Sequence, residues 1–150
     1  MDRAEAEVPS LNIDPEHLRI IMQGMDEVVN SPRGTARRSA IEDPDRAMGG
    51  KTGTAQVRRI SKAERDTGVR KSEDMEWRLR DHALFVGYAP VHDPRFVVSV
   101  IVDHGGGGSS VAAPIARDVL VETQRLFLDD DTKATTPAET GTDGLDRRTG

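Results

Sequence analysis

Four consecutive residues, Lys51-Thr52-Gly53-Thr54, have side chains and a spacing that could hold a negatively charged ligand. Lys51 supplies a positive charge. Thr52 and Thr54 stand two residues apart, so on a β-strand their hydroxyls project to the same face and can both hydrogen-bond one carboxylate. Gly53 has no side chain, so a ligand can come close to the strand edge. Such an edge can pair with an extended peptide, and a free N–H group there can stabilise an oxyanion.

The same stretch also invites comparison with the phosphate-binding loop G-x-x-x-x-G-K-[ST]. The first glycine of that motif would fall at Asp45, which has the wrong type and places a negative charge near the phosphate. A phosphate loop follows a buried strand and opens a helix. Here a polar segment broken by proline precedes the motif, and a strand-like segment follows it. A nucleotide-binding domain is therefore the remote alternative.

The histidines offer little further chemistry. His82, His92 and His104 each adjoin an aspartate at the end of an expected strand. Adjacent strand residues point to opposite faces, so each pair is a poor chelator. The chain has no cysteine, which excludes disulfides and thiol catalysis. We therefore expect no metal and no cofactor, and we expect the histidines to be polar turn and surface residues.

Length and composition limit the framework that can position these residues. The chain has 150 residues, 35% of them hydrophobic and 31% charged, which suits one domain with a modest core. No apolar run approaches the roughly 18 residues of a membrane span, and the first ten residues lack the apolar core of a secretory signal. The net charge of -5 argues against a general nucleic-acid binder.

The centre of the chain predicts three strands. Ala83–Tyr88 and Phe96–Val102 are short and almost continuously apolar, and the loop 89–95 between them contains two prolines. This pattern predicts an antiparallel hairpin. Because both strands are apolar on both faces, we expect them in the middle of a covered sheet. The more polar segment Thr54–Ile60 predicts an edge strand that Lys51–Thr54 would open.

Two helices are predicted to flank these strands. The first covers residues 14–30, with Asp14 as its cap and Pro15 in its first turn. Its apolar face is expected to comprise Leu18, Ile21, Met22, Met25, Val28 and Val29. The second begins near Pro114, and its buried face is expected to comprise Ile115, Ala116, Val119, Leu120, Leu126 and Phe127. The order of helix, strand, hairpin and helix predicts an α+β fold with an antiparallel sheet flanked by helices.

The remaining segments are polar. Residues 61–81 carry six acids and six bases and predict a partly helical surface insertion anchored by Trp77 and Leu79. Four glycines at 105–108 predict a flexible connection. Residues 129–150 hold six acids and three bases and almost no large apolar side chain, so we expect a disordered acidic tail. We interpret residues 1–13 as a linker and residues 14–128 as the folded part.

Together these stretches resemble a known family. The stretches are GGKTGTAQV, the charged insertion, RDHALFVGYAP, RFVVSVIVDHGGGG and the closing helix. They resemble the last third of the transpeptidase domain of class B penicillin-binding proteins, and within that class the cell-elongation branch. The resemblance covers roughly residues 9–128. It implies part of a serine β-lactamase/transpeptidase-like fold and a serine acyl-transferase with the motifs S-x-x-K, S-x-N and K-T-G. The substrate would be the D-Ala-D-Ala end of a peptidoglycan stem peptide, and β-lactam antibiotics would acylate the same serine.

The resemblance also implies roles for the motif residues. Lys51 would be the cationic catalytic residue, Thr52, Gly53 and Thr54 would bind the substrate or β-lactam carboxylate, and the Thr54 N–H would be an oxyanion donor. No serine in the chain is followed by lysine three residues later, and Ser10-Leu11-Asn12 is interpreted as linker. We therefore expect a fragment that is inactive alone.

The resemblance further implies partners and a location. The missing upstream part of the domain and elongation-complex proteins are the expected protein partners. The parent protein would face the periplasm from the inner membrane, although these residues hold no anchor. The second hairpin strand would normally pair with an upstream strand, so its edge would be bare and apolar. The alternative function is a non-catalytic binding or scaffold module that holds carboxylate-ended peptides at the Lys51–Thr54 edge.

Overall fold

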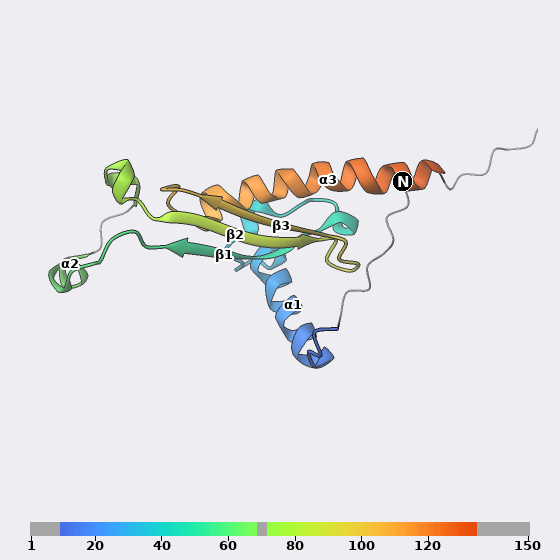
Figure 1. Ribbon diagram of the computed structural model, residues 1–150, viewed down its shortest axis with the longest axis horizontal. Helices are drawn as coiled ribbons and strands as arrows, with labels where there is room; N and C mark the ends of the chain where they lie inside the picture. The colour runs from blue at the N-terminus through green and yellow to red at the C-terminus, as the bar shows by residue number, and fades with distance from the viewer. Residues whose placement is uncertain (1–9, 69–71, 135–150) are drawn as a thin grey trace, which may run out of the picture.

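The computed structural model describes residues 10–68 and 72–134 and is organised around a three-stranded antiparallel sheet (Figure 1). Strands β1 (Gly49–Ala55), β2 (His82–Ala89) and β3 (Phe96–Val102) lie in the order β1-β2-β3. The predicted hairpin is the pair β2 and β3. The predicted α+β fold class is confirmed, because helices pack against an antiparallel sheet.

The two faces of the sheet differ in what covers them. On one face β2 contributes small or aromatic residues that are buried, and β3 contributes partly buried valines; these are Ala83, Phe85, Gly87, Ala89, Val98, Val100 and Val102. On the other face Val86, Val97 and Ile101 are 42%, 79% and 66% exposed. The expectation of a sheet covered on both faces is therefore wrong for the described residues, in which β3 is an edge strand.

Helix α3 (Ala113–Ala134) covers the buried face of the sheet (Figure 1). A π-helical turn over Gly108–Ala112 leads into it. Buried positions repeat every four residues at Ala112, Ala116, Leu120 and Gln124, and Ala113 beside the first of them is also buried. The predicted face is wrong in most of its members, because Ile115, Val119, Leu126 and Phe127 are exposed. Small alanines allow the helix to approach the sheet closely, and larger side chains at those positions would hold it away.

Helix α1 (Pro15–Asn30) has the predicted bounds and cap, with the Asp14 carboxylate accepting a hydrogen bond from the Glu16 N–H at 2.8 Å. Only its last turns dock on the sheet: Val29 is buried, and the Asn30 side chain donates to the Met48 carbonyl at 3.0 Å. The start of the predicted apolar face is exposed, including Leu18 and Ile21. The reason is geometric, because α1 points away from the sheet and only its C-terminal end reaches β1 (Figure 1).

Two short 3-10 turns, Arg37–Ser39 and Pro44–Arg46, bring the chain from α1 to β1. Met48 enters the core just before β1 and is fully buried.

The insertion after β1 contains α2 (Lys62–Thr67) and the 3-10 turns Ser72–Asp74 and Trp77–Leu79. The insertion is therefore partly helical, as the charge pattern predicted.

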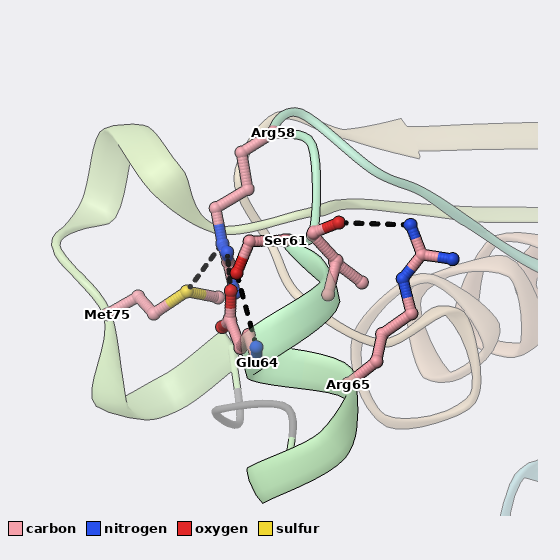
Figure 2. A network of polar contacts seen from close by, with 6 residues as sticks. Arg58, Ser61, Glu64, Arg65 and Met75 are labelled. Atoms are coloured by element: carbon pink, nitrogen blue, oxygen red, sulfur yellow. Dashed lines mark hydrogen bonds and ion pairs between the residues drawn. The ribbon is translucent and has the colours of Figure 1, made fainter.

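Arg58 organises the insertion (Figure 2). Its guanidinium donates to both Glu64 oxygens, at 2.7 and 2.5 Å, and its Nε donates to the Met75 sulfur at 3.2 Å. The Ser61 hydroxyl accepts from the Glu64 N–H and so caps α2. Met75 is 7% exposed, whereas Trp77 is 59% exposed and Leu79 is also exposed. The predicted anchors Trp77 and Leu79 are therefore wrong, and among the described residues of this segment Met75 is the buried side chain.

Helix α3 continues beyond the predicted start of the tail at residue 129. Its described part reaches Ala134, because no glycine or proline interrupts the sequence between Pro114 and Pro137. Residues 135–150 of the predicted tail and residues 1–9 of the predicted linker lie outside the described residues. Residues 10–13 of that linker have no regular structure.

Tyr88 links β2 to α1 through a hydrogen bond, and its raised pKa leads us to expect that the free energy of unfolding depends on pH. Its hydroxyl donates to the Met22 carbonyl at 3.2 Å. Burial, and to a lesser extent the negative charge of Asp26, raise the pKa of Tyr88 above its ordinary value of 10.0. The unfolded chain therefore ionises at a lower pH than the folded chain, and the contribution of Tyr88 to stability is present below pH 10 and lost as the pH rises through the folded pKa.

The measurement compares urea unfolding of the natural chain and Tyr88→Phe from pH 8 to pH 11. At pH 8 the variant is expected to be less stable by about 1 kcal/mol, because it lacks the hydrogen bond. Above pH 10 the difference should shrink, since only the natural chain loses the tyrosine contribution. If the difference in free energy of unfolding between the two proteins stayed constant over the whole range, the assignment would be contradicted. Ionisation of the lysines cannot produce the expected change in this difference, because it affects both proteins equally.

Candidate active-site strand

Strand β1 contains the Lys51–Thr54 motif in its middle. The predicted strand Thr54–Ile60 is right for Thr54 and Ala55 and wrong for residues 56–60, because β1 begins at Gly49 and ends at Ala55. Gly49 and Gly50 lie under aromatic rings of β2: a Cβ on Gly50 would collide with the Phe85 ring, and one on Gly49 would lie 2.9 Å from the Tyr88 ring. Glycine is depleted in strands, so the sequence pattern did not predict that β1 begins with Gly49 and Gly50.

One edge of β1 is open. Among the described residues β1 pairs only with β2, with Lys51 opposite Val86, Thr52 opposite Phe85 and Thr54 opposite Ala83. Backbone N–H and C=O groups alternate between the two edges of a strand, so about half of those in β1 face the open side. This edge can accept an extended peptide by strand addition.

The motif side chains divide between the two faces of β1. Thr52 and Thr54 pair with the buried Phe85 and Ala83 and lie on the face toward α3, and Lys51 lies on the opposite face. The Lys51 ammonium is exposed and donates to the Thr52 carbonyl at 2.7 Å. Lys51 also borders a shallow hollow of about 220 Å³ that it shares with Leu84, Val86, Ser99 and Ile101. The two hydroxyls thus share a face, as the spacing predicted.

The glycine run after β3 packs directly on the motif. A Cβ on Gly108 would collide with the carbonyl oxygens of Gly53 and Leu84 and would lie 2.9 Å from the Gly53 nitrogen. Gly106 and Gly108 are buried, and the Gly106 N–H donates to the Asp81 carbonyl at 2.8 Å. The φ of Gly106 is +87°, which favours glycine. The expectation of a flexible connection at residues 105–108 is therefore wrong, because this connection is closely packed.

Thr35 is a site residue that the sequence analysis missed. Its Oγ1 lies 3.2 Å from the Thr52 Oγ1, within hydrogen-bond distance. The loop after α1 places it there, since the Ala36 N–H donates to the Val28 carbonyl at 2.9 Å and a Cβ on Gly34 would collide with the same carbonyl. Seventeen residues separate the two threonines. The only local signal is Gly34, which marks a turn next to Thr35.

Two of the histidines that adjoin an aspartate join the insertion to the glycine run. The His104 N–H donates to the His82 Nδ1 at 2.9 Å, and the His104 ring lies 4.5 Å from the Trp77 ring, centroid to centroid. His82 and His104 are half-buried, which differs from the predicted surface position, and His92 is exposed. In residues 10–68 and 72–134 no three or more metal-binding side chains gather into one group.

Two further expectations concern the motif and the chain start. The phosphate-loop alternative is wrong, because Gly49–Thr52 lie inside a strand and the strand continues through Ala55. Ser10 lies in irregular chain ahead of α1, where its hydroxyl accepts from the Asn12 N–H at 3.3 Å.

Among the helices of the described residues, none combines the length and the apolar character that crossing a membrane requires.

Comparisons with known proteins find similar proteins by both sequence and structure. Residues 2–121 match the family model of the penicillin binding protein transpeptidase domain. The peptidoglycan D,D-transpeptidase MrdA of Haemophilus influenzae is 46% identical over 99 residues, covering 65% of this chain and 14% of that protein. The Pseudomonas aeruginosa PBP2 crystal structure in complex with WCK 5153 aligns with a TM-score of 0.59 and 33% identity, covering 86% of this chain and 24% of that chain.

A second solved structure, the complex of PBP2 and MreC from Helicobacter pylori, aligns with a TM-score of 0.60 and 28% identity. That alignment covers 75% of this chain and 18% of the other. The chain spans less than one fifth of the length of the curated relatives it matches. The likeness therefore concerns one part of those proteins, the part that contains β1 and α3.

The contact between Gly108 and Gly53 predicts the effect of a single methyl group. Gly108→Ala is expected to lower the free energy of unfolding by about 1–3 kcal/mol, because the methyl group would collide with the backbone of β1. Gly107→Ala is the matched control: its Cβ would meet only the movable Ser110 hydroxyl, and its φ of −95° suits alanine.

The measurement is urea unfolding of both variants, together with the amide chemical shifts of Thr52, Gly53 and Thr54. Gly108→Ala should shift these amides, and Gly107→Ala should leave them in place and change stability by less than about 1 kcal/mol. Equal stability of the two variants would show that the backbones do not touch.

Proposed function

Because the chain belongs to the penicillin-binding protein transpeptidase domain family, we propose that β1 forms one wall of the active site of a peptidoglycan D,D-transpeptidase. The observation that carries the proposal is the open edge of β1 with Lys51, Thr52 and Thr54 on it. The substrate is a stem peptide that ends in D-Ala-D-Ala. It lies along this edge as an added strand.

Each motif residue has a role in this proposal. The hydroxyls of Thr52 and Thr54 share a face of β1 and hydrogen-bond the terminal carboxylate. Lys51 supplies a positive charge on the other side of the strand, next to the hollow of about 220 Å³. The Thr54 N–H donates to the oxyanion of the tetrahedral intermediate. Gly53 keeps the edge accessible, and Gly108 behind it holds the strand in place.

The chemistry is acyl transfer in two steps. A serine hydroxyl attacks the carbonyl between the two D-Ala residues, its proton passes to a base, and the terminal D-Ala leaves as a protonated amine. The amine of a second stem peptide then attacks the ester, and the serine leaves with its proton restored. A β-lactam enters the same first step and forms a stable ester. No S-x-x-K occurs in this sequence, so the serine in this proposal belongs to another segment.

The exposed apolar face of the sheet supports a second segment. Val86, Val97 and Ile101 form a patch on the face opposite α3, next to the hollow that Lys51 borders. Exposed apolar side chains gathered on one face mark a contact surface. In our proposal the segment with the serine packs here and completes the site. This places the nucleophile on the same side of β1 as Lys51.

The comparisons suggest the setting of this reaction. The Helicobacter pylori neighbour was solved as a complex of PBP2 and MreC. We extend this to a place for the whole protein in a cell-elongation complex of the bacterial envelope, at the periplasmic face of the inner membrane. The alternative is a non-catalytic module that holds carboxylate-ended peptides at the β1 edge. The open edge of β1 fits both functions, and the lack of S-x-x-K in this sequence is the observation that favours the alternative.

Penicillin labelling separates the two functions. Residues 14–134 replace the matching segment of Haemophilus influenzae MrdA, whose remaining part is expected to supply the serine. We expect this chimera to react with a fluorescent penicillin and the 150-residue chain alone to show no covalent label. Lys51→Met should slow the labelling of the chimera by about 100-fold, as loss of an electrostatic group in an active site does.

Lys62→Met is the matched control, since Lys62 is an exposed lysine on α2 outside the motif. It should leave the labelling rate unchanged. A folded chimera that never reacts, or equal rates for the Lys51 and Lys62 variants, would favour the non-catalytic module. Labelling of the isolated chain would contradict the need for a second segment.

A further inference from the structure

A hollow of about 400 Å³ lies between the loop that follows α1 and the turn that precedes α3. It is lined by Thr35, Arg37, Arg38, Ser109 and Ser110, together with Pro32 and Gly34. The lining thus contains two guanidinium groups and three hydroxyls and no carboxylate. All of these groups can donate hydrogen bonds to an anion.

The two arginines have no direct partner in the described part of the chain. Neither Arg37 nor Arg38 forms an ion pair or a side-chain hydrogen bond there. Both also border a larger neighbouring cavity that Asp26 and Glu42 line, but neither carboxylate comes within ion-pair distance of them. An unpaired guanidinium offers a planar set of donors that matches a carboxylate with two parallel hydrogen bonds.

Both walls of this hollow are attached to the motif strand. On one side Thr35 lines the hollow and contacts the Thr52 hydroxyl at 3.2 Å. On the other side Ser109 and Ser110 follow Gly108 directly, and Gly108 packs on the backbone of Gly53. The hollow therefore begins where the proposed carboxylate site of Thr52 and Thr54 ends.

We propose that this hollow is a second anion subsite, which binds an acidic group placed next to the terminal carboxylate of the ligand. The proposal rests on the proposed function, because it assumes that Thr52 and Thr54 hold that terminal carboxylate. Arg37 and Arg38 bind the second acidic group, and Thr35 links the two subsites through the Thr52 hydroxyl. The ligand class is a peptide or β-lactam with two neighbouring anionic groups.

The test uses the full 150-residue chain and two matched peptides. The peptides are acetyl-Lys(acetyl)-D-Ala-D-Glu and its isostere ending in D-Gln, which differ only in one negative charge. Titration is followed by the amide signals of the chain, which detect weak binding and report folding at the same time. We expect both peptides to shift the Thr52–Thr54 amides and the D-Glu peptide to bind about tenfold more tightly, as a bidentate pair of charge-assisted hydrogen bonds to a guanidinium can provide.

The variants assign this preference to the arginines. In the double variant Arg37→Gln and Arg38→Gln the two peptides should bind equally, with the affinity of the D-Gln peptide unchanged. Arg33→Gln is the control, because Arg33 lies in the same loop and carries the same charge but does not line this hollow. That variant should retain the tenfold preference. Salt at 0.5 M should weaken the preference through screening.

The outcomes separate this proposal from the one on which it rests. Equal binding of both peptides at the Thr52–Thr54 amides, or a preference that survives the double arginine variant, would overturn the second subsite and leave the proposed function standing. Failure of both peptides to shift those amides would overturn both proposals. Loss of the preference in Arg33→Gln as well would assign it to the general charge of the loop and would also overturn the subsite.

Discussion

The contact between the backbones of Gly108 and Gly53 is the constraint on which the rest of this structure depends. With no side chain at Gly108, the start of the π-helical turn lies against the backbone of β1 and β2. That position sets where α3 begins and lets Ala116 and Leu120 cover the sheet. The same contact supports β1 from behind, on the face that Thr52 and Thr54 share. Packing of the core and orientation of the motif are thus consequences of one close approach.

This support gives β1 an unusual position among edge strands. An unpaired strand edge is normally a hazard for aggregation, and proteins protect it with charges, bulges or covering segments. Here β1 is held by β2 on one side and by the glycine run on one face, while its other edge stays open. An edge that is both rigid and unpaired is what a strand-addition site for a peptide requires. The exposed apolar patch on β2 and β3 lies on the opposite face and so does not obstruct that edge.

Sequence patterns predicted the elements that depend on local composition and missed those that depend on close approach. The hairpin of β2 and β3 was evident because β-branched and aromatic residues dominate both strands. The start of β1 was missed because Gly49 and Gly50, which fit beneath aromatic rings, have low strand propensity. The buried face of α3 was misassigned in most of its members because the buried positions are mainly alanines, while Ile115, Val119, Leu126 and Phe127 are exposed. The Lys51–Thr54 motif was recognised, but Thr35 could not be, since only folding brings it to Thr52.

Charge at the site shows why composition alone is a weak guide to the ligand. The chain has a net charge of -5, which predicts no affinity for anions. Electrostatic interactions in physiological salt decay over about 8 Å, so a ligand experiences the nearby charges much more than the total. Near β1 these charges are Lys51, Arg37 and Arg38, and the hollow beside Thr35 has no acidic lining. The acidic surplus lies in part on residues 129–150, beyond Leu128 of α3. An anion-binding edge is therefore consistent with an acidic chain, because the two properties belong to different parts of the molecule.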